Sequence, residues 1–191
     1  MSLKAEQKQR SRAAILESAV TLIRTRGIAA SSVMDVMKGA GLTVGGFYAH
    51  FDSKEALFRA TIQEAGSRMW DRLLATVKGD SPGERVYSVV RGYLSRSHRD
   101  YAALGCLLPS LLSELARDGG PAREALEAEI QGFVKGIAEM LGGGPEARRR
   151  AIGLIALMVG GLAMSRALGP GALSDDFLKA SRELAARELG A

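Results

Sequence analysis

The sequence predicts an all-α protein with about nine helices. Apolar residues recur at helical spacing along nearly the whole chain, beginning with Ile15, Ala19, Leu22 and Ile23. Breaks that contain glycine or proline separate these segments, as helix ends require. Aromatic residues make up only 5% of the chain, which disfavours a large β-barrel or β-sandwich.

The helices follow one another in a regular order. Ser32 with Asp35, Asp52 with Glu55, and Ser81 with Glu84 have the spacing of helix N-terminal caps. The predicted helices span 15–27, 32–38, a short segment from 43, 52–78, 82–94, 107–115, 121–141, 147–168 and 174 to the C-terminal region.

Composition excludes several classes of protein. The chain has 191 residues, of which 47% are apolar and 25% charged, so it can bury a core and is not predicted to be disordered. Its single cysteine, Cys106, excludes an internal disulfide and a cysteine-rich zinc site. It has only two histidines, no Glu-x-x-His pair, no phosphate loop and no nucleophile elbow. We therefore expect no metal, no cofactor and no enzymatic activity.

The charge balance allows a nucleic-acid partner. The net charge is +5, and no apolar segment follows the basic N-terminal residues, so we expect no signal peptide. The longest apolar run, 151–164, is shorter than the roughly 20 residues that a membrane span needs. The expectation is a buried helix, no membrane contact and a cytoplasmic protein.

One segment predicts more than a fold. Residues 32–51 read SVMDVMKGAGLTVGGFYAHF, which describes a helix, a tight turn at Gly41 and a second short helix. Its apolar positions form one face that includes Phe51 and either Val44 or Phe47. Small or polar residues occupy the other face, as in a helix-turn-helix that presents its second helix to the DNA major groove. The pair Gly45-Gly46 indicates either a close approach of backbone to DNA or simply a short, irregular helix.

The string AGLTVGGFYAHF at 40–51, followed by DSKEALF at 52–58, resembles the DNA-binding domain of TetR-family transcriptional regulators. The resemblance covers roughly residues 8–60, and the remainder agrees with the family only in length and helical character. It implies a TetR-like fold with a three-helix helix-turn-helix domain over 1–55 and a helical effector-binding and dimerisation domain over 56–191. It also implies a homodimer that represses transcription from a palindromic operator.

The family pattern assigns roles to individual residues. Tyr48 and Lys54 would contact phosphates, and Ser32 would do so at the start of its helix. The full predicted DNA interface is Ser32, Thr43, Val44, Gly45, Tyr48, His50 and Lys54. The alternative for His50 is a packing or capping role. The alternative for Tyr48 is a ring that is half-buried against the first helix.

Two departures from the family qualify these assignments. Met37 stands where the family has a small residue, and the recognition helix carries no Lys or Arg. Contacts with the DNA backbone and recognition of DNA shape would then contribute more of the DNA affinity than contacts with base edges. Lys8, Arg10 and Arg12 form either a mobile basic arm or a solvated tail.

The sensor half is predicted less sharply. Five residues are candidates for an apolar effector pocket, with ordinary core as the alternative: Trp70, Tyr93, Cys106, Phe133 and Met158. They favour a small apolar or aromatic effector. Cys106 is either a redox or electrophile sensor or a small buried hydrophobe.

Residues 151–164 are apolar nearly all round, which by itself predicts only a buried helix. The resemblance to the TetR family implies that the last two helices form the dimer interface. Its candidate residues are Leu154, Met158, Gly161, Phe177 and Leu184. The alternative is that 151–164 is the central core helix of a monomer. A DNA-binding protein without an effector remains the alternative function.

Overall fold

The computed structural model describes residues 2–101, 105–118 and 120–191, and these ranges contain nine α-helices, one 3-10 helix and no strand. The all-α prediction is confirmed. The helices are α1 (Leu3–Arg26), α2 (Val33–Gly39), η1 (Val44–Ala49), α3 (Lys54–Leu74), α4 (Pro82–Tyr93), α5 (Arg96–Asp100), α6 (Leu108–Asp118), α7 (Pro121–Met140), α8 (Gly144–Leu168) and α9 (Ala172–Leu189).

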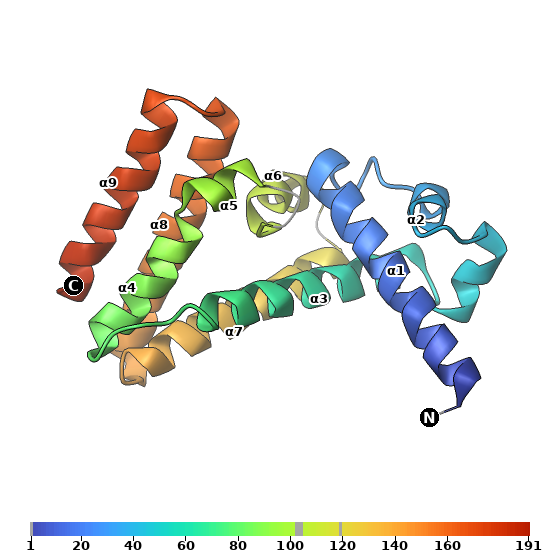
Figure 1. Cartoon of the computed structure of the whole chain (residues 1–191), viewed down its shortest axis with the longest axis horizontal. Coiled ribbons are helices and arrows are strands. Elements are labelled where there is room, and N and C mark those ends of the chain that lie inside the picture. The colour runs from blue at the N-terminus through green and yellow to red at the C-terminus, as the bar shows by residue number, and fades with distance from the viewer. Residues whose placement is uncertain (1, 102–104, 119) are drawn as a thin grey trace.

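The helices form two groups, which the long helix α3 joins (Figure 1). α1, α2 and η1 lie at one end, and α8 and α9 pack side by side at the other. α3 contacts α1 near its own start and packs along α7. The predicted boundary between residues 55 and 56 falls in the first turn of α3, so the two predicted units share a continuous helix.

Local signals fixed several helix ends correctly. Ser32 caps α2 through the amide of Asp35, and Ser81 and Glu84 form a reciprocal capping box at α4. At α3 the cap is Ser53, whose hydroxyl accepts from Ala56, and not the predicted Asp52. Both residues precede the helix, and the hydroxyl of Ser53 is the one that reaches the free amide.

Two helices differ from prediction. α1 begins at Leu3, twelve residues before Ile15, so Lys8, Arg10 and Arg12 lie on a helix and not on a mobile arm. α5 was not predicted, because its five residues show no apolar periodicity. Polar contacts stabilise α5 instead, since Ser95 caps it and buried Arg99 pairs with Asp100.

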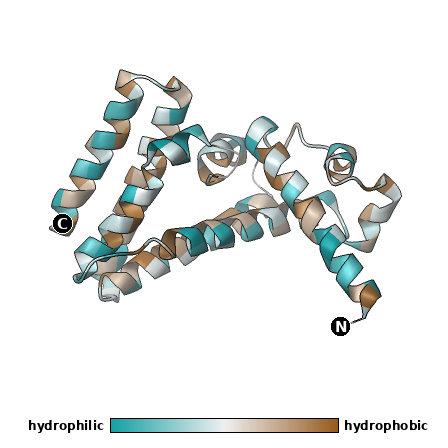
Figure 2. Cartoon of the chain, in the orientation of Figure 1, coloured by the Kyte–Doolittle hydropathy of each residue, from teal (hydrophilic) through white to brown (hydrophobic). Residues whose placement is uncertain are grey.

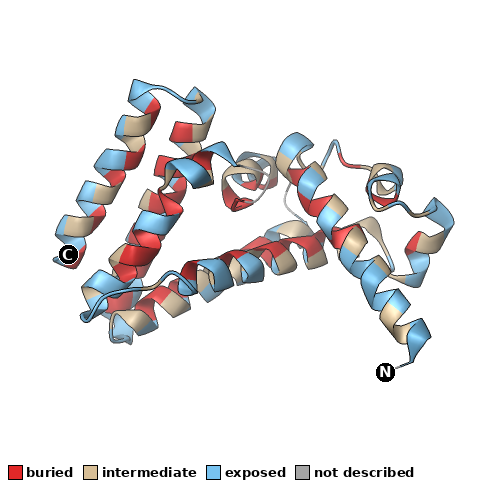
Figure 3. Ribbon diagram, in the orientation of Figure 1, coloured by how far each residue is buried: buried red, intermediate tan, exposed pale blue. Residues whose placement is uncertain are grey.

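The apolar side chains form one connected core (Figures 2 and 3). α1 buries a stripe that includes Ile15, Ala19 and Ile23, and the same core continues through α3 and α4 to α8. Figure 3 shows buried residues on the facing sides of the helices and exposed residues on their outer sides. The N-terminal helices α1 and α2 and the helices that follow them are therefore packed together through apolar contacts.

α8 is longer than its apolar run suggested. It has 25 residues and is the one helix in the described ranges that is long and apolar enough to cross a membrane. In its most apolar window, 39% of the residues are buried inside the chain, where α8 packs on α6, α7 and α9. This packing is that of a core helix with one uncovered side.

Glycine sets the distance between α3 and α7. A Cβ atom at Gly136 would lie 2.3 Å from Cζ2 of Trp70, whose ring also packs on Phe133 at a centroid distance of 5.5 Å. Gly132, one turn earlier on the same helix, would meet nothing within 4 Å. The two glycines thus share a helix and differ only in what lies against them.

We predict opposite effects of alanine at these two positions. Gly136→Ala forces the Trp70 ring to move and lowers the free energy of unfolding by about 1–3 kcal/mol. Gly132→Ala lowers only the backbone entropy of the unfolded state, so it raises the free energy of unfolding by about 0.5–1 kcal/mol. Equilibrium denaturation at one protein concentration measures both, and equal shifts would contradict the close approach of α3 and α7.

Candidate nucleic-acid interface and ligand site

The helix-turn-helix is built on a small buried core. Val36, Met37 and Phe47 are at most 1% exposed, and Phe51 stacks on Phe47 at a ring distance of 6.0 Å. Phe47 rather than Val44 is therefore the inward residue. The turn passes through Gly41, whose φ of +69° is a conformation that favours glycine.

The outer face of η1 is open to solvent. Tyr48 is 75% exposed and Val44 is 47% exposed, and Thr43 and Gly45 beside them are also exposed. The ring of Tyr48 meets Phe47 edge-on at 5.2 Å, so it stands outward and is not half-buried against α1. Methyl groups, a hydroxyl and bare backbone thus share one surface, as contact with base edges and phosphates requires.

Gly45 has no structural reason to be glycine. Its φ is not positive, and an added Cβ would meet nothing within 4 Å. At Gly46 the nearest atoms would lie at 3.9 Å, including Cε of Met37, which is ordinary contact. η1 is a six-residue 3-10 helix, which agrees with the alternative of a short, irregular helix. Packing within the chain requires neither glycine, so both leave space outside the chain free.

Of the other predicted DNA contacts, Lys54 and Ser32 have partners within the chain. Lys54 begins α3 and places its Nζ 5.3 Å from the ring centre of Phe58. The Ser32 hydroxyl donates to the Asp35 carboxylate at 2.6 Å, a hydrogen bond that lowers the pKa of Asp35. His50 is half-buried, and its Nδ1 atom makes no hydrogen bond within the described ranges. The half-buried position of His50 suits a packing role better than contact with a DNA base.

The five predicted pocket residues line two adjoining apolar hollows. Trp70, Tyr93 and Met158 line a hollow of about 20 Å³, and Cys106 lines another of about 10 Å³. Phe133 lines both, so its ring separates them. Both spaces are smaller than a ligand, and a molecule could enter only if side chains such as that of Phe133 moved.

Polar groups at these hollows are few. The Tyr93 hydroxyl is buried near the Cys106 thiol without a hydrogen bond of normal geometry. Burial raises the pKa of Tyr93 and also that of the Cys106 thiol. A buried, protonated thiol is a poor nucleophile, so this conformation favours the interpretation of Cys106 as a buried hydrophobe.

Glu129 is a residue that the sequence analysis missed. It lines the smaller hollow and lies against Gly66 of α3, where an added Cβ would overlap its carboxylate. Burial raises the pKa of Glu129. Its spacing could have found it, because Glu129 stands three residues after Leu126 and four before Phe133, on the apolar side of α7.

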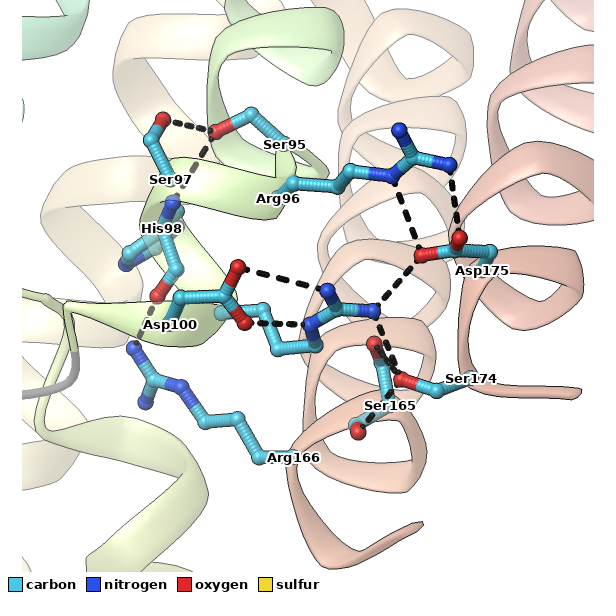
Figure 4. Close-up of polar contacts among 10 residues, drawn as sticks. Ser95, Arg96, Ser97, His98, Asp100, Ser165, Arg166, Ser174 and Asp175 are labelled. Carbon is cyan, nitrogen blue, oxygen red and sulfur yellow. Dashed lines mark hydrogen bonds and ion pairs between the residues drawn. The ribbon is translucent and has the colours of Figure 1, made fainter. Parts of the chain in front are cut away.

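A polar network fixes the segment before α6, and Figure 4 shows the part of it in which Arg166 contacts His98. His98 Nε2 accepts from the amide of Cys106 at 2.8 Å, so Nδ1 carries the proton and donates to the Tyr93 carbonyl at 2.6 Å. Burial is the main cause that lowers the pKa of His98 to about 4. Arg166 of α8 donates to the carbonyls of His98 and Cys106 at 2.7 and 3.2 Å. A neutral His98 is thus a structural residue.

The same network extends to the C-terminal helices. Buried Arg99 pairs with Asp100, and Figure 4 shows Arg96 of α5 beside Asp175 at the start of α9. Arg99 donates to Asp175 at 2.7 Å and to Ser174 at 2.9 Å. Arg96 adds a second ion pair to Asp175 at 2.6 Å. These contacts attach α5 to α9.

Three predicted dimer residues lie inside a single chain. Leu154 and Met158 are at most 4% exposed, and a Cβ at Gly161 would lie 2.4 Å from the Ser181 hydroxyl of α9. They face helices of their own chain, so this correction removes them from the surface that a second copy could contact. Leu184 is 53% exposed and Phe177 is half-buried, and both lie on the outer side of α9.

No group of three or more metal-ligating side chains occurs within the residues that the structure describes.

Known proteins resemble the chain at two levels. The family described as "Bacterial regulatory proteins, tetR family" matches residues 15–61. "Uncharacterized HTH-type transcriptional regulator YvdT" of Bacillus subtilis is 33% identical over 93 residues, which are 47% of this chain and 48% of that protein. "HTH-type transcriptional repressor KstR2" of Rhodococcus jostii is 42% identical over 50 residues, covering 26% of this chain and 24% of that protein. The matched segments thus span half or less of these relatives.

Solved structures resemble the whole fold. A TetR transcriptional regulator from Chloroflexus aurantiacus has a TM-score of 0.82 and 22% identity, and the match covers 97% of this chain and 96% of that one. The reduced form of Escherichia coli NemR has a TM-score of 0.79 and 20% identity, with 93% and 96% covered. The predicted TetR-like architecture is confirmed.

The helix-turn-helix segment matches the family in sequence, and the whole chain matches TetR regulators in fold. Residues 15–61 therefore form a domain of the tetR family of bacterial regulatory proteins, and the whole chain has the fold of TetR regulators.

Proposed function

We propose that the chain is a cytoplasmic transcriptional repressor that binds a palindromic operator as a homodimer and releases it when a small apolar effector binds. The open face of η1, with Gly45 at its centre, is the observation that carries this proposal. The name of the relative KstR2 supports repression, since that protein is called a repressor. The family consists of regulatory proteins, which disfavours an enzyme.

DNA binding of this kind would rely on backbone and shape. η1 carries no cation, so bidentate arginine–guanine contacts cannot come from it. Val44 offers methyl groups to a thymine methyl, and the exposed Tyr48 hydroxyl can reach a phosphate at the groove edge. Lys54, at the first turn of α3, combines its charge with free backbone amides that also attract phosphate.

A dimer would bury the outer side of α8 and α9. Ile152 is 48% exposed, and small residues follow it along the same side at Gly153, Ala156 and Gly160. Neither glycine would meet any atom of its own chain through an added Cβ. With Leu173 and Leu184 on α9, these residues form an apolar surface of two helices, which a second copy related by two-fold symmetry would cover.

An effector would act on the two hollows. Their walls are apolar, with the Tyr93 hydroxyl as a polar group that a ligand could satisfy. Filling them requires Phe133 to move between α3, α6 and α7, so the ligand would bind a rearranged state better than this one. That differential affinity is what release from DNA needs. A DNA-binding protein without an effector is the alternative, and the absence of ligand-dependent release would favour it.

The proposed DNA binding can be measured directly. In a fluorescence-anisotropy titration, the wild type should bind the promoter DNA that flanks its own gene in preference to unrelated DNA, and added salt should weaken binding. Lys54→Ala should reduce the slope of affinity against salt concentration by about one. Gly45→Ala should weaken binding at least tenfold, because its methyl group holds the backbone away from the bases.

The stability of these variants separates contact from folding. Gly45→Ala should be as stable as the wild type or more stable, since its added methyl meets nothing in the chain. Gly132→Ala is the matched control, and its DNA affinity should not change. Undiminished affinity in Gly45→Ala would show that DNA does not contact this face.

The proposed dimer surface on α8 can be tested by placing a charge on it. Gly160→Arg places a long charged side chain on the outer surface of α8 and should convert a dimer to a monomer in sedimentation velocity. Gly132→Arg puts the same side chain at an equally open position on α7 and should leave the dimer intact. A Gly160→Arg variant that sediments like the wild type would exclude this surface as the interface.

A further inference from the structure

The first three turns of α1 stand apart from the core. The buried residues of α1 begin at Ile15, and the turns before it project beyond the other helices at the end of the molecule that holds η1 (Figure 1). Between Leu3 and Ala14 these turns contain four cations and one carboxylate, a net charge of +3. Packing of the core does not depend on this charge.

Three of the cations lie in one line along the helix. Lys4, Lys8 and Arg12 are four residues apart, so they share one face of α1, and all three are exposed. We call these three residues the basic stripe. Glu6 lies on the opposite side of the helix, where it pairs with Arg10 at 3.7 Å. The one carboxylate of the segment is therefore turned away from the stripe.

The positive charge of the stripe is not neutralised within the part of the chain that the structure describes. Lys4 and Lys8 make no side-chain hydrogen bond or ion pair there. The guanidinium carbon of Arg12 lies 5.0 Å from the ring centre of Phe51, and this is its one side-chain contact of that kind. An aromatic ring holds a cation in place without cancelling its charge. Three exposed cations thus remain available to an external anion.

The contact between Arg12 and Phe51 fixes the position of the stripe. Phe51 stacks on Phe47 of η1 and precedes Lys54, the proposed phosphate contact, by three residues. One end of the stripe therefore lies beside the helix-turn-helix. α1 is a continuous helix, so Lys4 at the other end lies about 12 Å from Arg12 along the axis. This length is about that of three or four successive phosphates of one DNA strand along the duplex axis.

We propose that the basic stripe binds the DNA phosphate backbone next to the groove that η1 contacts. This inference rests on the proposed DNA binding and adds a second contact surface to it. η1 has no Lys or Arg of its own, and the stripe would supply cations that release counterions from the duplex. Because the cations stand on a formed helix, binding would not have to order a mobile arm.

Fluorescence anisotropy of the full-length protein with the promoter DNA that flanks its own gene tests the stripe. Lys4→Gln/Lys8→Gln should reduce the slope of log affinity against log salt concentration by about two. Contacts with phosphates do not depend on base sequence, so binding to promoter and to unrelated DNA should weaken by the same factor, about tenfold or more. Thermal unfolding should not change, because both lysines lie outside the core.

A matched variant controls for the loss of charge. Arg85→Gln/Arg91→Gln removes two exposed cations from α4, which lies at the other end of the molecule from η1 (Figure 1). Its salt slope and its affinity for both DNAs should equal those of the wild type. A general effect of net charge on the approach of DNA would weaken both double variants equally.

A second pair of variants tests whether the helix holds the stripe in position. Gln9 is exposed within the same turns of α1. Gln9→Pro keeps every cation but interrupts the helix, so it should weaken DNA binding nearly as much as removal of the two lysines. Gln9→Ala preserves the helix and should bind DNA like the wild type.

The outcomes separate this inference from the proposed function. A wild type that shows no preference for promoter DNA would contradict both. Retained promoter preference with an unchanged salt slope in Lys4→Gln/Lys8→Gln would overturn the stripe alone. So would an equal loss of affinity in the α4 control, or full affinity in Gln9→Pro. A reduced slope that is confined to the lysine variant, together with weak binding by Gln9→Pro, supports the stripe.

Discussion

The carboxylate of Glu114 attaches α6 to the segment between α1 and α2, and we infer that this contact orients the helix-turn-helix and its η1 face. Glu114 lies on α6 and accepts from the amide of Ile28 at 2.8 Å and from that of Ala29. The preceding Gly27 has a φ of +80°, and an added Cβ there would lie 2.6 Å from the Glu114 carboxylate. The end of α1 is therefore shaped to receive this side chain, and Arg24 adds a second attachment one turn earlier.

α3 provides the other connection between the two units. Its 21 residues extend about 30 Å from Lys54, at the proposed phosphate contact, to Trp70 and Leu73 at the larger hollow. A change in the packing of Trp70 would therefore act on the same helix that carries Lys54. An effector that favours another position of α3 or α6 would change the relation of the two η1 faces in a dimer, which is a coupling free energy between two sites.

Local patterns predicted the features that depend on neighbouring residues. The string around Gly41 and Phe47 defined the helix-turn-helix, and the caps at Ser32 and Ser81 defined two helix starts. Periodicity also showed that residues 151–164 of α8 are apolar nearly all round. It could not tell which side faces its own chain, so Leu154 and Met158 were assigned to the wrong side of the helix. Which side of α8 is buried depends on where α7 and α9 pack against it, and residue spacing does not predict that packing.

Long-range polar contacts were beyond sequence reasoning for the same reason. Glu114 and Ile28 are 86 residues apart, and Arg24 and Gly105 are 81 apart, so no motif joins them. α5 was missed because Ser95, Arg99 and Asp175 stabilise it in place of an apolar stripe. Charged residues in such a sequence look like ordinary surface positions until the fold shows their partners.

Hydrogen exchange of a Glu114→Gln variant tests most directly whether this carboxylate positions the DNA-binding unit. Charged hydrogen bonds contribute about 1.5–3 kcal/mol, so their weakening should speed exchange in the last turn of α1 and in α2 by about tenfold or more. Exchange in α8 and α9 should not change, and Glu127→Gln on the exposed side of α7 should behave like the wild type. Unchanged exchange in α1 and α2 of Glu114→Gln would contradict the account and leave apolar packing between α1 and α3 as the connection that orients η1.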